Sequence, residues 1–336
     1  MLSLAGGGVF LWLASHRIDL WPTSLELPRP ELLWVAAALH VPYAVVRAMR
    51  LGYVFDPLVA GAGGPSRMDR RVLYGSGFVS FLVLMVLPFK LGELSRPLLL
   101  VKGRQPGVGM AESISGVATE RVVDGLIICA MLFGGLALAS QTRADALGEL
   151  ADVQHAGRLL LSVFAIGLGV LVWCAIDLER AAALARRMTQ RVSPRLADDV
   201  VALTHRFAGA VRTLIQMRRG SAFLAWSVIY WVITTLQLWL VLAACGLELG
   251  AAEASAIVAI VGLSIQLPGG PAQAGTFQIG ASLALALFVA DDAIASAGSS
   301  FTAVMYLLQL LGALVMAVPG VALMAASRAP GPPLQP

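Results

Sequence analysis

The stretch "LPFKLGELSRPLLLVKGR", from Leu87 to Arg104, decides how this chain is expected to fold. It places Lys90, Glu93 and Arg96 in one of the most apolar neighbourhoods of the sequence. A charge at the centre of a bilayer costs about 3 kcal/mol on insertion scales, so charged residues at such positions are candidates for function. Two questions follow: whether the chain spans a membrane, and how this stretch lies in it.

The composition answers the first question. Hydrophobic residues make up 58% of the 336 residues and charged residues only 13%, which is more apolar surface than one soluble core would bury. Continuous apolar runs such as 222–246 are long enough for helices that span a bilayer, and apolar and polar residues do not alternate as a barrel requires. We predict an all-α polytopic protein of the cytoplasmic (inner) membrane. The run 2–14 has no basic n-region, so we predict a short first span and not a signal peptide.

The charges of the loops predict the topology. Residues 178–220 contain nine arginines against three acidic residues, which indicates a cytoplasmic segment under the positive-inside rule. The loop 56–71 carries three arginines and is assigned to the same side, whereas the acidic loop 141–157 suits the outside.

These assignments constrain the opening stretch. If 74–101 crossed the membrane once, the next helix would run inward and the arginine-rich segment 178–220 would lie outside the cell. If 74–101 crossed twice, each helix would be only about 21 Å long, which is too short for a hydrocarbon core of roughly 30 Å. We therefore predict a re-entrant hairpin, broken at Pro88. A second broken element, 263–285, carries Pro268, Gly270, Pro271 and Gly275 and is predicted to be a hairpin that enters from outside.

The predicted map has about six spanning helices and two re-entrant helical hairpins. The crossings lie near 2–15, 31–53, 112–139, 157–177, 221–246 and 299–326. Both termini are then cytoplasmic. The order of span, hairpin and span recurs with opposite orientation, as in an inverted repeat. We expect one transmembrane domain, 1–326, which includes the basic segment 178–220, and a disordered tail, 327–336.

A mixed-charge cluster is expected near the first hairpin. On one helix, Glu120 and Asp124 are four residues apart and share a face, and Arg121 lies three residues before Asp124. Together with Lys90, Glu93 and Arg96, these residues form either an ion-pair network that locks the hairpin or a polar cavity that receives a charged head group or carries protons.

Arg47 and Arg50 lie three residues apart near the cytoplasmic end of the second predicted span. They either extend to the membrane interface or bind phosphate, since a guanidinium group matches phosphate oxygens. The basic segment 178–220 is expected to contact anionic lipid head groups and not nucleic acid, because few aromatic residues lie between its arginines.

No cofactor or metal site is predicted. The four histidines lack paired spacing, and the three cysteines lie far apart in apolar runs, where they are expected to be buried. No GxxxxGK[ST] motif is present, so ATP is not expected to drive this chain.

Several motifs together resemble a known family. "RAMRLGYVFDP", "LPFKLGELSRPLLLVKGR", "ATERVVDGL" and "LPGGPAQAGTFQIG" resemble, in order and spacing, the flippase-like integral membrane family that includes the transmembrane portion of lysylphosphatidylglycerol synthases. This resemblance implies a multi-span protein that handles anionic or polyprenyl-linked lipids. Gln278 stands where many relatives have an acidic residue, which puts simple charge coupling there in doubt. Because the chain stops without a soluble domain, aminoacyl transfer is not expected.

We therefore expect a lipid translocase, a transporter more than an enzyme, that moves an anionic phospholipid or a polyprenyl-phosphate-linked lipid. A membrane-embedded transferase and a non-catalytic partner that presents lipid to a separate synthase or glycosyltransferase are the alternatives. In the translocase, arginines bind phosphate, carboxylates position them or exchange protons, and the second hairpin supplies free backbone amides. The candidate substrate-binding residues are Arg47, Arg50, Lys90, Glu93, Arg96, Glu120, Arg121, Asp124, Pro268, Gly270, Pro271, Gly275 and Gln278.

Overall fold

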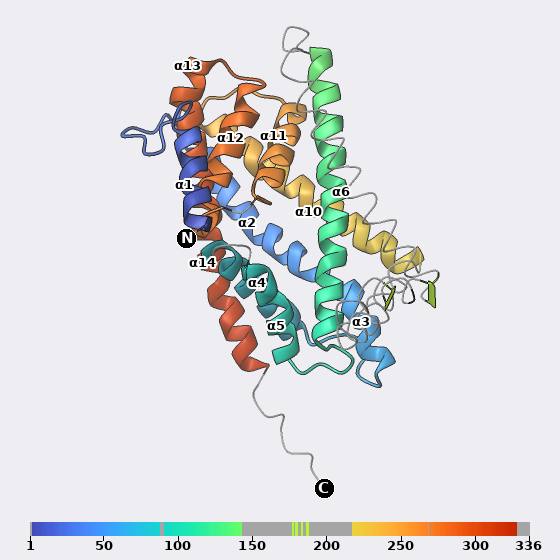
Figure 1. Ribbon diagram of the computed structural model, residues 1–336. Helices are drawn as coiled ribbons and strands as arrows, with labels where there is room; N and C mark the ends of the chain where they lie inside the picture. The colour runs from blue at the N-terminus through green and yellow to red at the C-terminus, as the bar shows by residue number, and fades with distance from the viewer. Residues whose placement is uncertain are drawn as a thin grey trace.

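The protein is helical throughout the part of the chain that the structure describes. The computed structural model describes residues 2–87, 91–142, 217–267 and 269–327, together with a few isolated positions from 177 to 187. Every regular element in these ranges is a helix or a helical turn, which confirms the all-α fold class (Figure 1). Lys90, Pro268, nearly all of the predicted crossing 157–177, most of the basic segment 178–220 and the tail after residue 327 lie outside the described residues.

Four helices are long and apolar enough to cross a membrane. They are Glu31–Gly61, Met110–Ala139, Gly220–Ala244 and Asp291–Ala326. The first consists of α2 (Glu31–Met49) and α3 (Gly52–Gly61); the second and third lie in α6 (Met110–Thr142) and α10 (Met217–Ala244). The last consists of α13 (Asp291–Ala293), a π-helical turn (Ile294–Gly298) and α14 (Ser299–Ala326). These helices correspond to four of the six predicted crossings, so a multi-pass membrane protein is supported.

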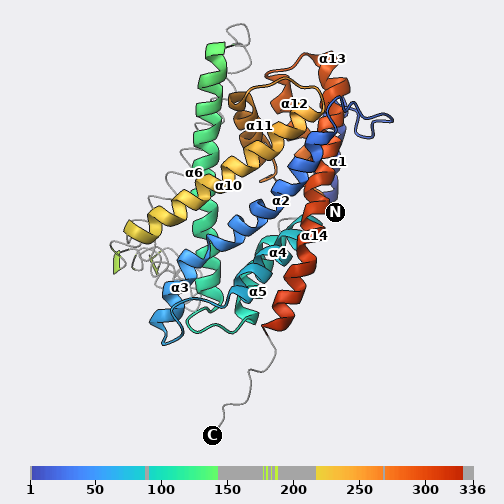
Figure 2. The same cartoon turned by 180° about the vertical axis from the view of Figure 1, so that it is seen from behind.

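The long helices each begin or end at one shared end of the molecule. α2 leads to α3, and α6 begins and α14 ends toward that same end of the molecule (Figures 1 and 2). α10 begins in contact with α3 and packs along α2. The basic stretch 56–71 therefore lies at the end of the molecule opposite to Asp291 and Asp292.

The segment 74–101 forms two helices that pack against each other. α4 (Arg70–Val86) starts at Asp69, whose side chain accepts a hydrogen bond from the Arg71 amide at 2.8 Å. It ends at Leu87, which is extended, as expected for a residue that precedes a proline. After the break come a 3-10 turn (Leu91–Leu94) and α5 (Ser95–Lys102), which packs on α4. Gly92 allows this close approach, because a Cβ there would collide with the Leu84 backbone.

The second broken segment has the same form. α11 (Ala251–Ser264) packs against α12 (Thr276–Ala286), and a 3-10 turn (Pro271–Gln273) lies between them. The turn requires left-handed backbone at Ala272, Gln273 and Gly275, with φ of 57°, 60° and 88°. Tyr306 of α14 anchors it by donating a hydrogen bond to the Ala272 carbonyl at 2.9 Å.

The turns of the two helix pairs meet in the middle of the molecule. The pairs approach each other from opposite ends (Figure 1), and α4 contacts the turn of the second pair. Leu84 and Leu87 of the first pair share a small hollow with Gly269 and Gly270 of the second. The structure thus brings together two segments that are far apart in the sequence.

The first helix corrects one prediction. α1 (Leu2–Ala14) has 13 residues, which cover only about 20 Å, so the crossing predicted near 2–15 falls short of the hydrocarbon core. α1 instead packs against α12 and the turn before it. Its Gly7 lies so close that a Cβ there would be 2.7 Å from the Gly270 amide nitrogen.

The outer surface is apolar, as a lipid-facing surface should be. On α14, a stripe of large apolar side chains at helical spacing is exposed, namely Leu307, Leu311, Leu314, Val318 and Val321. Trp21, which lies between α1 and α2, and Trp34, which lies near the start of α2, are also strongly exposed. Tryptophans are enriched where a bilayer meets water, and these two suit one edge of the apolar surface.

Candidate functional site

A buried arginine joins three of the long helices. Arg50 lies at the junction of α2 and α3, and its side chain is fully buried. Its Nη1 donates to Asp124 Oδ1 at 2.5 Å and its Nη2 donates to Asp124 Oδ2 at 2.6 Å, a bidentate contact with α6. On α10, Ser227 Oγ accepts from Nη1 at 3.1 Å, and the Tyr230 ring lies 4.6 Å from the guanidinium carbon. Arg50 therefore holds α2, α6 and α10 together.

The carboxylate of Glu120 extends this contact to the first helix pair. Glu120 is fully buried on α6; its Oε1 accepts from Arg50 Nη2 at 2.6 Å and its Oε2 accepts from Arg96 Nη1 at 2.7 Å. Arg96 belongs to α5, and its Nη2 also reaches the Arg47 carbonyl at 3.4 Å. One carboxylate thus links α5 to the junction after α2.

These buried charges balance one another. Two guanidinium groups, Arg50 and Arg96, face two carboxylates, Glu120 and Asp124, and Trp231 Nε1 adds a hydrogen bond to Asp124 at 3.1 Å. Buried ions are tolerated where opposite charges and hydrogen bonds satisfy them in this way. Of the two interpretations left open by the sequence, the geometry favours the ion-pair network for these four residues.

A second ion pair lies at the edge of the network. Arg121 Nε donates to Glu93 Oε2 at 3.1 Å, and both side chains are partly exposed. Among the hydrogen bonds of the described residues, none comes from the two terminal nitrogens of Arg121. Those nitrogens are therefore available to a ligand.

Arg47 differs from the other arginines of the cluster. It is 94% buried on α2, yet no carboxylate of the described residues lies within ion-pair distance of it. Its guanidinium carbon lies 4.6 Å from the centre of the Phe81 ring, a cation–π contact. Together with Arg121, Arg50 and Arg96 it makes four guanidinium groups against three carboxylates, so the described part of the cluster carries one net positive charge.

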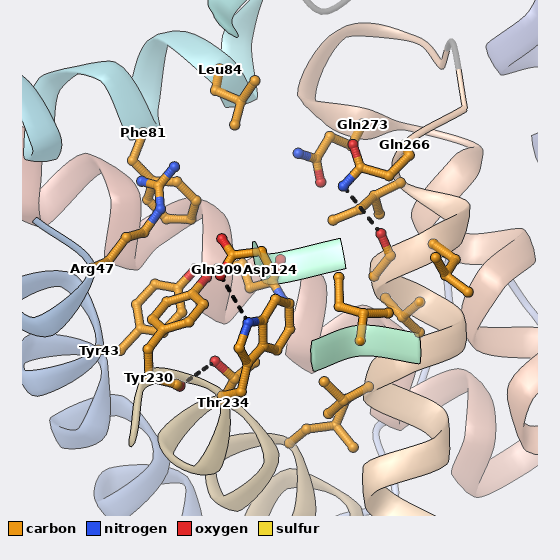
Figure 3. Close-up of a pocket in the computed structure, with 18 of the residues that line it drawn as sticks. Tyr43, Arg47, Phe81, Leu84, Asp124, Tyr230, Thr234, Gln266, Gln273 and Gln309 are labelled. Atoms are coloured by element: carbon orange, nitrogen blue, oxygen red, sulfur yellow. Dashed lines mark hydrogen bonds between the residues drawn. The ribbon is translucent and has the colours of Figure 1, made fainter. Parts of the chain in front are cut away.

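Arg47 and Arg121 line a cavity of about 270 Å³. Figure 3 shows Arg47 stacked on Phe81, with Asp124 and the aromatic rings of α10 in the centre of the view. Residues of α2, α4, α6, α10, α11 and α14 contribute to the wall, and so does the turn of the second helix pair. The polar or aromatic members are Tyr43, Arg47, Phe81, Arg121, Asp124, Tyr230, Trp231, Thr234, Gln266, Gln273 and Gln309.

The sequence-predicted residues divide into two sets around this cavity. Arg47, Arg121 and Asp124 line it, whereas Arg50, Glu93, Arg96 and Glu120 lie in the ion pairs behind them. Among the described residues, no group of three or more His, Cys, Asp or Glu side chains could hold a metal ion.

The predicted residues of the second hairpin have a different position. Pro271, Gly275 and Gln278 do not line the cavity, and Gly270 lines only the small hollow between the two turns. The expected free amides are bonded at two of these positions: the Gly270 amide donates to the Ala274 carbonyl at 3.0 Å, and the Gly275 amide donates to Gln278 Oε1 at 2.8 Å. Gln278 thus caps the start of α12.

Several cavity residues were not predicted from the sequence. On α10, Tyr230, Trp231 and Thr234 line the cavity. Together with Ser227, which bonds to Arg50, they recur at spacings of three and four residues, a polar and aromatic stripe on an otherwise apolar helix. That spacing was a signal that pointed to them. Gln309 stands alone on α14 and offered no comparable pattern.

Comparison with known proteins agrees with the geometry. No curated protein and no solved structure matches the chain. A family model described as "Lysylphosphatidylglycerol synthase TM region" matches residues 1–322, nearly the whole chain. An apolar outer surface around a buried charged core is compatible with a transmembrane region linked to lipid handling. The chain therefore belongs to the family of lysylphosphatidylglycerol synthase transmembrane regions.

Proposed function

We propose that the protein translocates a lipid with an anionic head group across the cytoplasmic membrane. The observation that supports this most directly is Arg47, a buried guanidinium that faces a cavity and has no carboxylate partner among the described residues. A buried charge without a partner is costly, so a bound anion supplies the missing partner. Phosphate suits a guanidinium group, and the family's link to lipids makes a lipid phosphate the natural source.

The four charges of the buried ion pairs have a supporting role in this proposal. Arg50, Arg96, Glu120 and Asp124 hold α2, α5, α6 and α10 at fixed positions around the cavity. They act as positioning residues, and the terminal nitrogens of Arg121 provide a second contact for the phosphate. The sequence led us to expect phosphate binding by Arg47, Arg50 and Arg96. The present proposal keeps Arg47, adds Arg121, and makes Arg50 and Arg96 positioning residues.

The two helix pairs are proposed to be re-entrant hairpins. Each pair enters from one end of the molecule and turns near its middle, so a membrane around the apolar surface would have both turns at its centre. The end that carries the basic stretch 56–71 faces the cytoplasm, in line with the positive-inside rule. Opposed hairpins that meet at the midplane are the arrangement expected of an inverted repeat and of alternating access.

A liposome assay tests the translocation. The purified full chain is reconstituted in vesicles that contain phosphatidylglycerol labelled on an acyl chain, and the loss of label from one leaflet is followed with a reductant that does not cross the membrane. We expect Arg47→Gln to slow the movement by at least about tenfold, because the phosphate loses its charged partner. Arg67→Gln is the matched control, since Arg67 is exposed and lies away from the cavity.

Three outcomes oppose the proposal. Equal rates for the wild type and Arg47→Gln would remove Arg47 from the site. No movement above empty vesicles would contradict translocation itself. A covalently altered lipid, detected by mass spectrometry, would favour the transferase.

A further inference from the structure

Among the described residues, the charged groups of the cavity wall that have no ion-pair partner for all their polar atoms are positive. Arg47 and the terminal nitrogens of Arg121 are available to a ligand, whereas Asp124 is the one carboxylate among the lining residues that the structure describes. Both Asp124 oxygens accept hydrogen bonds from Arg50, and Oδ1 also accepts from Trp231. An ammonium group in this cavity would therefore meet two guanidinium groups and no uncommitted carboxylate.

The remaining polar wall is neutral. Three glutamines line the cavity, from the turn after α11, the turn before α12 and α14: Gln266, Gln273 and Gln309. Figure 3 draws Gln266 and Gln273 on the opposite side of the cavity from Arg47. Among the hydrogen bonds of the described residues, none involves the side-chain amide of Gln273 or Gln309.

Side-chain amides match hydroxyl groups better than they match ions. Each amide offers a donor and an acceptor, and so does each hydroxyl of a glycerol or a sugar. The Tyr43 and Tyr230 hydroxyls, themselves 3.3 Å apart, add further neutral partners on the side of Arg47. A cavity of about 270 Å³ is near the lower limit of ligand pockets and suits a small head group, not a long oligosaccharide.

We infer that the cavity receives a phosphodiester lipid whose head group beyond the phosphate is uncharged and rich in hydroxyls. Arg47 and Arg121 contact the phosphate, and Gln273 and Gln309 contact the hydroxyls. Lipids with an ammonium on the head group, including the aminoacylated lipid after which the family is named, are discriminated against. This inference rests on the proposed function for its lipid source, but it makes a separate statement about binding.

Binding is therefore measured apart from transport. The shift in unfolding temperature of the purified chain in detergent is recorded with phosphatidylglycerol, with a polyprenyl-phosphate hexose, with phosphatidylethanolamine and with lysylphosphatidylglycerol. We expect the first two lipids, or one of them, to stabilise the chain at concentrations at least about tenfold lower than the last two. Whichever of the first two lipids stabilises the chain at the lower concentration shows whether the phosphodiester belongs to a phospholipid or to a polyprenyl lipid.

Two substitutions test the named contacts. Gln309→Met keeps the shape but removes the hydrogen bonds, so it should weaken binding of the hydroxyl-bearing lipid by roughly twofold to tenfold and leave phosphatidic acid, which has no hydroxyl head group, unchanged. Gln309→Glu adds a carboxylate and should shift the preference toward lysylphosphatidylglycerol. Thr235→Val is the control, because Thr235 lies on α10 outside the cavity lining and bonds to the Trp231 carbonyl.

The results separate this inference from the proposed function. Selective binding without movement in liposomes would uphold the head-group class and overturn translocation. Movement without selectivity, or stronger stabilisation by an ammonium-bearing lipid, would overturn the head-group class and leave translocation intact. If Gln309→Glu and the wild type preferred the same lipids, Gln309 would not be part of the binding site.

Discussion

Glu120 accepts a hydrogen bond from Arg50 at 2.6 Å, with both side chains completely buried. The second oxygen of the same carboxylate accepts from Arg96 at 2.7 Å. Two cations from two different helices therefore depend on one anion of α6. This carboxylate therefore links α6 to α5 and to the junction after α2.

Glu120→Gln should destabilise the protein strongly. The substitution keeps the shape of the side chain but leaves two buried guanidinium groups with only Asp124 as counter-charge, and breaking a buried pair in this way costs about 3–5 kcal/mol. Unfolding of the purified chain in mixed micelles, followed by circular dichroism, measures the loss. Glu26→Gln serves as the control, because Glu26 is exposed. Identical unfolding curves for Glu120→Gln and the wild type would show that the network does not stabilise the fold.

Substitution by glutamine should destabilise the protein much more at Arg50 than at Arg47. Arg50→Gln leaves two buried carboxylates without their shared partner and should cost about 3–5 kcal/mol. Arg47→Gln removes a charge that has no carboxylate partner among the described residues, so the loss should be limited to the contact with Phe81, on the order of 1 kcal/mol. The expected pattern is a normal unfolding transition with slow lipid movement for Arg47→Gln. A larger loss of stability for Arg47→Gln than for Arg50→Gln would contradict the division into binding and positioning residues.

The sequence was enough to place these charges near one another. Glu120 and Asp124 share a helix face because they are four residues apart, and the broken segment before them is too short to cross the membrane twice. Together these facts predict that Arg96 and Glu120 are neighbours, and the structure shows them bonded. The all-α class and four crossings followed from apolar length alone.

The sequence could not show which charge remains unpaired. Arg47 and Arg50 are three residues apart with similar neighbours, and the carboxylates that pair with Arg50, those of Glu120 and Asp124, lie 70 and 74 residues away in the chain. Whether a carboxylate reaches one arginine or the other depends on the turn of the chain after α2, which brings Arg50 inward. Gln309 was missed for a related reason, since its role depends on the packing of α14 across the molecule.

Gly7 and Gly8 provide a matched test of the packing of α1. A Cβ at Gly7 would lie 2.7 Å from the Gly270 amide nitrogen, a contact that requires the backbone of α1 or of the second turn to move. A Cβ at Gly8 would meet no atom within 4 Å. We expect Gly7→Ala to lower stability by about 1–3 kcal/mol, as overpacking does, and Gly8→Ala to leave it nearly unchanged. The two unfolding temperatures, measured in the same detergent, give the comparison; equal effects would mean that α1 does not pack on the turn.

Labelling of single cysteines tests the orientation of the first hairpin. Arg104 follows α5, so a re-entrant hairpin places it on the same side as Arg67, before α4, whereas Glu248 lies after α10 at the opposite end. Arg67→Cys, Arg104→Cys and Glu248→Cys are made singly in a chain whose three native cysteines are replaced by alanine. With a thiol reagent that does not cross membranes, we expect Glu248→Cys to react in intact cells, and the two arginine variants to react only in inverted vesicles. All three side chains are exposed, so lack of reaction reflects the membrane and not burial. If Arg104→Cys reacted in intact cells, as Glu248→Cys does, while Arg67→Cys reacted only in inverted vesicles, the segment from α4 to α5 would cross the membrane completely.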